Sequence, residues 1–567
     1  MMSSAQAGST VSQDHSSRRF IGSSFGRVTV IAILLAYGAL ALYHLSVPDL
    51  DADEGRYGTS ALNILNDYHQ IAIVSPDPGG VPWSTWPYAY PSLLAGSIVL
   101  LGKTEFALRL VNVVLMLLTA LCIYKLAVLL IKNRTIALLA FGLFLLNPST
   151  IAYARSAMAE PSVVFWGCAA MVAAASYRES GRPAYAALSG VALGLGFLSK
   201  LWLILPFGAA VALLLLSRLP DEKMGKIVRD AALGFVVFLL VGGSHLLLLR
   251  LLSPESLKIW LGTYFQGAAA TRVGGAGYDP NMWYKPWWFY FGALFKGVFF
   301  GLPLLFLGIS DLVRRRRYLV LGCAAWLVGP VFVLSLFKVK EAAYGSQAYP
   351  ALALLMACGV LPFLETARSL EVALSALASI VLAEFFFLVG VVTRMQVAGM
   401  LALYVLYLAA APPKLLLLRW RKGAAIVALA MLLLTDAVVV QRALAHRTNY
   451  REVASYFRSR VGPLHPGVVT FTSPEFSAIG FYLFRQGEYW DTFYFHKSDE
   501  QFQSELEHGD RLFYVVDPSG TLYGGKFKPE WRALLAQNTR DITAEVEQAT
   551  GTNIGLRVLV PATEHQP

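Results

Sequence analysis

The chain has 567 residues and a mass of 62.0 kDa; 56% of its residues are hydrophobic, only 15% are charged, and the mean hydropathy is +0.55. Soluble domains carry roughly 25% charged residues, so this composition argues against an ordinary soluble enzyme, a disordered chain and a coiled coil. The net charge of +11 needs no nucleic acid to explain it, because Lys and Arg gather on the cytoplasmic side of membrane helices. Apolar runs near 20 residues recur along the sequence, which indicates an all-α polytopic membrane protein.

The charges divide the chain into parts. Residues 446–567 hold 12 Lys and Arg against 15 Asp and Glu, whereas residues 1–445 hold 35 against 21. The pattern predicts a cytoplasmic N-terminal tail over 1–27, a basic membrane domain over 28–445 and a small soluble α/β domain over 446–567.

The apolar run Val28–Val47 predicts an uncleaved first membrane helix. A polar stretch, Pro48–Pro91, follows it, and the next apolar piece, Ser92–Leu101, is too short to span, so it predicts a helix on or dipping into the membrane. Further runs bring the expected number of spans to thirteen, and they lie near residues 106–131, 135–153, 161–177, 184–200, 202–217, 231–252, 288–309, 318–337, 349–364, 370–393, 397–412 and 423–442.

Lys and Arg collect in alternate short loops, for example at Arg314–Arg317, which places the N-terminus in the cytoplasm. An odd number of spans then places residues 446–567 outside, together with the long loops 48–105 and 253–287. We therefore expect a protein of the bacterial cytoplasmic (inner) membrane whose chemistry takes place on the outer face.

The C-terminal segment alternates β-rich runs with helix-like pieces, as a small α/β domain does. The predicted strands are Val468–Thr472, Tyr489–Phe495 and Leu512–Val516. The predicted helices are Glu475–Phe484, Asp499–Glu507 and Pro529–Gln537.

The first polar cluster, Asp51–Tyr57, comes just after the outer end of the first helix. On composition alone it is equally well an ordinary solvated loop. The functional interpretation is a general base, Asp53 or Glu54, next to a phosphate-binding Arg56. Such a carboxylate can take a proton from a hydroxyl.

Four further groups face the same side of the membrane. They are Arg155 with Glu160, Lys200, Arg272 in the second long loop, and Lys340 with Tyr344. Each has an ordinary alternative, such as a loop ion pair or a Lys that reaches to the membrane surface. Together they outline a site for a lipid-borne anion, because Lys and Arg bind phosphate.

Several segments resemble the GT-C glycosyltransferases related to protein O-mannosyltransferases, and most of all the bacterial lipid A 4-amino-4-deoxy-L-arabinose transferases. The segment Asp53–Tyr57 is similar to their D-E-x-R-Y motif, and Lys340–Tyr344 is similar to their K-x-x-x-Y motif. The other supporting matches, in chain order, are Glu105–Leu110, Ala154–Arg155 with Glu160, and Gly194–Lys200. The stretch Trp86–Pro91 differs, since it lacks the acid and the lysine of their E-K-P-P-like segment.

The resemblance implies an inverting membrane glycosyltransferase that moves a sugar from a polyprenyl-phosphate donor to an acceptor hydroxyl. It implies catalytic roles for Asp53, Glu54 and Glu160, and binding of the donor phosphate or lipid by the residues Arg56, Tyr57, Arg155, Lys200, Arg272, Lys340 and Tyr344. No cofactor is certain, and dependence on a divalent metal is left open. The partners are the donor, membrane lipids and a lipid, glycan or protein acceptor, without nucleic acid; sugar, acceptor and oligomeric state stay open.

The alternative is a transporter or flippase of a lipid-linked saccharide. Its ion-coupling residues would be His245, Glu384 and Asp436, which lie within apolar runs. We expect each of them instead to be a packed, hydrogen-bonded residue inside the bundle. The large outer loops with carboxylates favour transfer, and the sequence shows no inverted repeat of the kind that transporters carry.

Overall fold

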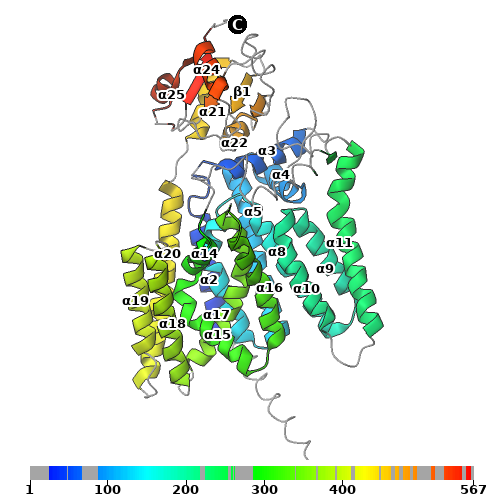
Figure 1. Ribbon diagram of the computed structural model, residues 1–567, viewed down its shortest axis with the longest axis vertical. Helices are drawn as coiled ribbons and strands as arrows, with labels where there is room; N and C mark the ends of the chain where they lie inside the picture. Colours follow the sequence, from blue (N-terminus) through cyan, green and yellow to red (C-terminus); the bar gives the residue numbers. More distant parts are fainter. Residues whose placement is uncertain are drawn as a thin grey trace, which may run out of the picture.

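The computed structural model describes residues 24–47, 49–66, 87–217, 224–252, 257–258, 261, 285–338, 340–364, 368–389, 393–409, 416–445, 449–461, 467–471, 477–484, 490–494, 513–516, 529–551, 554 and 557–562. A long helical bundle carries a smaller segment with a β-sheet at one end (Figure 1). Two helices, α3 (Ala52–Asn66) and α4 (Ala89–Leu101), lie across this end of the bundle, beneath the sheet-containing segment. We call this end of the bundle the sheet end.

Each of the thirteen runs that the sequence predicts to span contains helical structure among its described residues. The helices of the bundle are α2 (Ser24–Leu42), α5 (Glu105–Ile131), α6 (Arg134–Leu145), α7 (Pro148–Ala154), α8 (Glu160–Ser180), α9 (Pro183–Phe197), α10 (Leu205–Leu216), α11 (Met224–Leu252), α14 (Phe289–Val298), α15 (Leu302–Arg314), α16 (Tyr318–Ser335), α17 (Tyr349–Leu364), α18 (Ser369–Leu388), α19 (Arg394–Ala409) and α20 (Leu416–Ala445), with short 3-10 turns η2 (Leu201–Ile204), η3 (Phe299–Gly301) and η4 (Ala342–Ala348). By length and apolar composition, 7 helices among the described residues can cross a membrane, or up to 8 if a bent pair counts as one span. The number of thirteen spans therefore stays a prediction.

The bent pair is α6 and α7, where the sequence predicts one straight span over 135–153. The two helices meet at 59°. Asn147 causes the break, because its side chain accepts a hydrogen bond from the N–H of Ser149 at 2.9 Å and so caps a new helix. Pro148 follows in the first turn, where its missing N–H costs nothing. The Asn147 side chain also donates to the carbonyl of Gly297 at 2.6 Å, which fixes the bend against α14.

Close helix contacts in the bundle depend on small residues. A Cβ at Gly308 would lie 1.9 Å from the carbonyl oxygen of Leu355, and a Cβ at Gly359 would lie 1.9 Å from that of Leu304. Only glycine lets α15 and α17 approach so closely, as in other membrane helix pairs.

The C-terminal segment contains helices and one sheet. Its helices are α21 (Tyr450–Val461), α22 (Ser477–Phe484), α24 (Pro529–Asn538) and α25 (Thr543–Thr550). Its strands are β1 (Gly467–Phe471), β2 (Trp490–Tyr494), β3 (Phe513–Val516), β4 (Thr539–Asp541) and β5 (Arg557–Pro561). The order is β2-β1-β3-β5-β4; β1 runs parallel to β2 and β3, whereas β5 runs antiparallel to β3 and β4.

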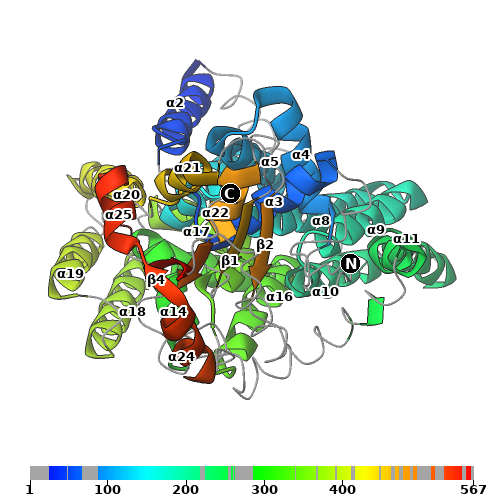
Figure 2. The same cartoon turned by 90° about the horizontal axis from the view of Figure 1, so that it is seen from above.

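The three strands predicted from the sequence coincide with β1, β2 and β3, and two of the predicted helices coincide with α22 and α24. The third predicted helix, Asp499–Glu507, lies outside the described residues. Viewed from above, the sheet and α22 lie over the bundle and not beside it (Figure 2). Buried side chains of α3, α4, α21 and α22 belong to one hydrophobic core, which joins the C-terminal segment to the sheet end.

Candidate active site

The first acidic cluster forms the start of α3. Asp53 and Glu54 lie in its first turn, where the helix dipole favours negative charge. A guanidinium nitrogen of Arg56 donates to Asp53 Oδ1 at 3.0 Å, and both side chains are partly exposed. Neighbouring residues on a helix point about 100° apart, so Asp53 and Glu54 face different surroundings.

Glu54 is buried and holds four hydrogen bonds. Its Oε1 accepts from Arg109 Nε at 2.9 Å and from the N–H of Ala157 at 2.7 Å. Its Oε2 accepts from Arg109 Nη2 at 2.7 Å and from the N–H of Asp51 at 2.9 Å. Burial raises the pKa of the Glu54 carboxyl, but the charge of Arg109 and these hydrogen bonds outweigh burial and bring the pKa below its usual value. A carboxylate held in this way is a structural anchor and a poor proton acceptor.

The second acid forms a buried ion pair. Glu160, in the first turn of α8, lies with Oε1 2.6 Å from Lys200 Nζ, and Lys200 follows the end of α9. Glu160 is fully buried, and its Oε2 has no hydrogen-bond partner among the described residues. The ammonium of Lys200 also lies 5.4 Å from the ring centroid of Tyr344, a cation–π distance.

Glu341 is a site residue that the sequence interpretation missed. It lies between Lys340 and Tyr344, so its place inside a candidate motif was the available signal. Burial raises the pKa of its carboxyl, and the nearby charge of Lys200 and a hydrogen bond with Tyr344 oppose that rise. The charges of Asp53 and Glu160 act on the same carboxyl. The structure therefore brings the acids of α3, α8 and the η4 segment into one electrostatic group around Lys200.

Arg155 binds the end of the first helix. Its Nη1 donates to the carbonyls of Leu40, Ala41 and Tyr43 at 3.0, 3.2 and 2.7 Å. These carbonyls lie at the C-terminus of α2, where no further helical N–H is available to them. The observed contacts are thus those of a helix cap.

Of the three remaining candidates, one binds backbone carbonyls, one is buried near Lys200, and one lies outside the described residues. The ammonium of Lys340 donates to the backbone carbonyls of Lys285, at 2.8 Å, and Phe337. Tyr57 is buried edge-on against Tyr90, with ring centroids 5.0 Å apart, and lies within electrostatic reach of Lys200. Arg272 lies outside the described residues.

The three residues of the transporter alternative do not form a group. His245 is buried on α11 beside the ring of Tyr88, and Asp436 is buried on α20. The expectation of a packed, hydrogen-bonded residue is wrong for Glu384, which is exposed on α18. Its hydrogen-bonded part is also wrong for Asp436, whose two carboxylate oxygens have no hydrogen-bond partner among the described residues. No group of three His, Cys, Asp or Glu side chains in the described part of the chain is placed to hold a metal ion.

Comparison with known proteins supports the resemblance. The sequence profile of the dolichyl-phosphate-mannose-protein mannosyltransferase family matches residues 81–250. An undecaprenyl phosphate-alpha-4-amino-4-deoxy-L-arabinose arabinosyl transferase of Pectobacterium carotovorum is 29% identical over 275 residues, 46% of each chain. A transferase of the same name from Pseudomonas fluorescens is 26% identical over 366 residues, 63% of this chain and 61% of its own. The chain spans about half the length of the curated relatives it matches.

Solved structures cover almost the whole chain. ArnT from Cupriavidus metallidurans bound to undecaprenyl phosphate superimposes with a TM-score of 0.65 at 15% identity, over 96% of this chain and 99% of that one. The chain has the GT-C fold. An Archaeoglobus fulgidus oligosaccharyltransferase aligns with a TM-score of 0.54 at 12% identity, over 86% of this chain and 69% of its own. This GT-C fold confirms the predicted class, a mainly helical multi-pass membrane protein.

Proposed function

We propose that this chain is an integral membrane glycosyltransferase that moves a sugar from a polyprenyl-phosphate donor to an acceptor hydroxyl. The observation that carries the proposal is a pair of acid–cation contacts, Asp53 with Arg56 and Glu160 with Lys200, at the sheet end of a GT-C bundle. One ArnT structure that shares this fold is bound to undecaprenyl phosphate, the lipid phosphate that such a donor leaves behind.

In the proposed step, the acceptor oxygen forms a bond to the anomeric carbon. The bond from that carbon to the phosphate oxygen breaks, its electron pair stays on the phosphate, and polyprenyl phosphate leaves. The acceptor's proton passes to Asp53, the partly exposed acid that pairs with Arg56. Attack opposite the leaving group inverts the anomeric carbon.

In the proposed step, the cationic side chains bind the phosphate of the donor. Arg56 and Lys200 supply charge to the leaving oxygen, and Tyr344 lies beside Lys200. A phosphate that binds Arg56 competes with Asp53 for the guanidinium, which leaves Asp53 to accept the proton. Arg272 keeps its proposed role at the phosphate. Since Arg155 and Lys340 bind backbone carbonyls, we assign them to support of the site.

We also propose the topology that the loop charges predict: a cytoplasmic tail over 1–27, thirteen spans over 28–445 and an extracytoplasmic α/β domain over 446–567, in the bacterial inner membrane. A cysteine at Ser498 should react with an impermeant thiol reagent in intact spheroplasts, and a cysteine at Ser310 should not. Labelling at Ser310 alone would overturn the orientation and place the site on the cytoplasmic face.

The decisive experiment is donor-dependent transfer by the purified protein in lipid nanodiscs. The first donor to test is undecaprenyl phosphate-alpha-4-amino-4-deoxy-L-arabinose, with lipid A, other glycolipids and envelope protein as acceptors and mass spectrometry of the products. We expect a glycosylated product with the wild type and a loss of roughly 10²–10⁴-fold with Asp53→Asn. Movement of the lipid-linked sugar across vesicles without any product would contradict transfer and favour the transporter.

A further inference from the structure

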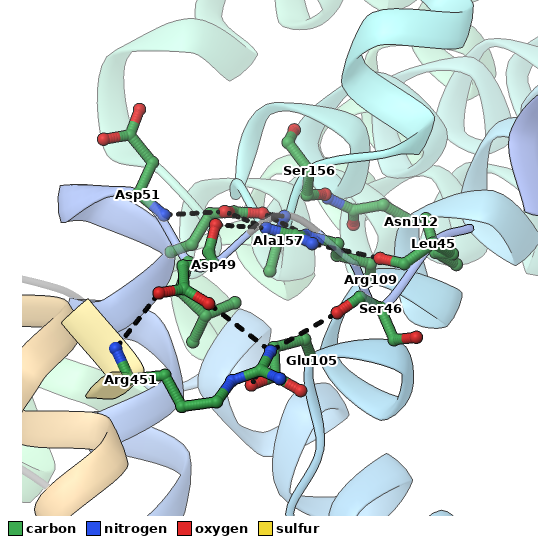
Figure 3. A network of polar contacts seen from close by, with 12 residues as sticks. Leu45, Ser46, Asp49, Asp51, Glu105, Arg109, Asn112, Ser156, Ala157 and Arg451 are labelled. Atoms are coloured by element: carbon green, nitrogen blue, oxygen red, sulfur yellow. Dashed lines mark hydrogen bonds and ion pairs between the residues drawn. The ribbon is translucent and has the colours of Figure 1, made fainter. Parts of the chain in front are cut away.

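The C-terminal segment contacts the loop that leads into the acidic cluster. Arg451, in the first turn of α21, donates its backbone N–H to Asp49 Oδ2 at 3.0 Å (Figure 3). Its guanidinium lies 3.0 Å from Glu105 Oε1 and 3.4 Å from Asp49 Oδ1. The hydroxyl of Tyr482 on α22 accepts from the N–H of Leu50 at 2.9 Å. The C-terminal segment thus contacts the loop between α2 and α3 through the Arg451 guanidinium and the Tyr482 hydroxyl.

Helix α22 also packs directly on the turn of α3 that carries the candidate base. A Cβ at Gly55 would lie 2.3 Å from Ala478 Cα, and a Cβ at Gly58 would lie 2.8 Å from the ring of Phe481. Only glycine allows this approach. The helix that bears Asp53 therefore has α22 against one face and the bundle against another.

The contacts continue from Arg451 toward the segments that carry Asp53 and Glu160. The carbonyl of Asp49 accepts from Arg109 Nη2 at 2.9 Å, and Arg109 in turn holds Glu54. Glu54 is the direct neighbour of Asp53. Its other oxygen accepts from the N–H of Ala157, which lies three residues before Glu160. One hydrogen-bonded network, drawn in Figure 3, therefore runs from the C-terminal segment to the loops that present the two acids.

We propose that Arg451 is a positioning residue, and that the C-terminal segment acts through it to hold the loops that lead into the acid-bearing helices α3 and α8 in their working geometry. The catalytic part of this inference rests on the proposed transferase function. The geometric part does not, because it concerns only how firmly the loop is held. A displacement of about 1 Å can cost on the order of 10²-fold in rate when the chemistry itself is untouched.

The test compares Arg451→Met with Arg557→Met, both in full-length protein in nanodiscs. Arg557 is a matched control, because it also forms an Arg–carboxylate pair in the C-terminal segment, with Asp541 at 2.7 Å, but on the sheet. Hydrogen–deuterium exchange is measured for peptides covering residues 45–58 and 155–160. In parallel, kcat and KM are measured with undecaprenyl phosphate-alpha-4-amino-4-deoxy-L-arabinose as the donor.

Arg451→Met should raise exchange in both peptides and lower kcat by roughly 10-fold to 100-fold, with KM within about twofold, since the phosphate-binding side chains are unchanged. Arg557→Met should do neither. Unchanged exchange in residues 45–58 overturns the proposal, and so does faster exchange throughout residues 446–567, which would mean that Arg451 only stabilises its own segment. If Arg451→Met does not fold, Arg451→Lys decides, with an intermediate rise in exchange expected. If the wild type shows no transfer, the proposed function fails while the exchange data still decide the role of Arg451.

Discussion

Replacing Glu54 with Gln separates an anchoring acid from a catalytic one. The change keeps the shape of the side chain but turns one acceptor oxygen into an N–H donor. Either the Arg109 Nε and Ala157 N–H donors or the Arg109 Nη2 and Asp51 N–H donors then lose their acceptor. Each unsatisfied buried donor costs about 1–3 kcal/mol, and breaking a buried ion pair costs about 3–5 kcal/mol in total. Glu54→Gln should therefore destabilise the folded protein by about 3–5 kcal/mol.

The assay is thermal unfolding of the purified protein, measured beside turnover for the same preparations. Glu54→Gln should lower the melting temperature and reduce activity in proportion to the folded protein that remains. Asp53→Asn should leave the melting temperature near the wild-type value and remove turnover, because its partner Arg56 is partly exposed. Asp51→Asn, at an exposed position, is the control that changes neither. A Glu54→Gln protein with normal stability and no turnover would refute the anchoring role and make Glu54 the base.

Three further changes test the remaining charges. Lys200→Met removes the partner of buried Glu160 and should cost at least about 2 kcal/mol in transition-state stabilisation, measured as a lower kcat/KM. A normal kcat/KM at a normal protein level would mean that Lys200 only packs against its neighbours. Since the folded pKa of Glu341 is raised, the folded state binds more protons than the unfolded state above the usual carboxyl pKa, and its contribution to stability falls as pH rises through the folded pKa. As the pH rises from about 4 to about 7, the melting temperature of Glu341→Gln should therefore fall less than that of the wild type. Equal falls would contradict the raised pKa. Asp436→Asn should raise the melting temperature and leave transfer unchanged, because both buried carboxylate oxygens of Asp436 lack a hydrogen-bond partner among the described residues. Lost stability or lost activity would argue for a functional carboxyl at this position.

The course of the helices could be predicted from the sequence because apolar runs and loop charges are local signals. The break between α6 and α7 could not, although both of its causes are visible in the sequence. Asn147 and Pro148 sit inside an apolar run, and hydropathy averages over them. The bend depends on Asn147 finding the carbonyl of Gly297, which is 150 residues away along the chain.

The strands likewise could be predicted only where the local sequence pattern is clear. The β-rich runs that became β1, β2 and β3 stand out by composition, whereas β4 is only three residues long and reads Thr539-Arg540-Asp541. It is a strand because it pairs antiparallel with β5, with Asp541 opposite Leu559. Such a pairing is tertiary information that no local pattern carries.

Telling the two acids apart was beyond the sequence for a related reason. Asp53 and Glu54 are adjacent and equally acidic, and either one fits the motif. Their difference is fixed by Arg109, which lies 55 residues from Glu54 along the chain and reaches it from α5. Only the fold shows that Glu54 is buried in its ion pair, whereas Asp53 pairs with Arg56 and stays partly exposed.

The cations follow one physical rule that the sequence hides. Arg155 binds backbone carbonyls at the C-terminus of α2. Lys340 binds the backbone carbonyls of Lys285, which lies before α14, and Phe337, which follows α16. Arg56 and Lys200 lie next to carboxylates, and they form ion pairs. A backbone carbonyl cannot take up a proton in place of its cation, so releasing that cation to a substrate leaves the carbonyl without a donor. A carboxylate can take a proton instead, so its cation can be shared with an incoming phosphate. If the proposed transferase function holds, Arg56 and Lys200, and not Arg155 or Lys340, are therefore the side chains that we expect to couple donor binding to proton transfer.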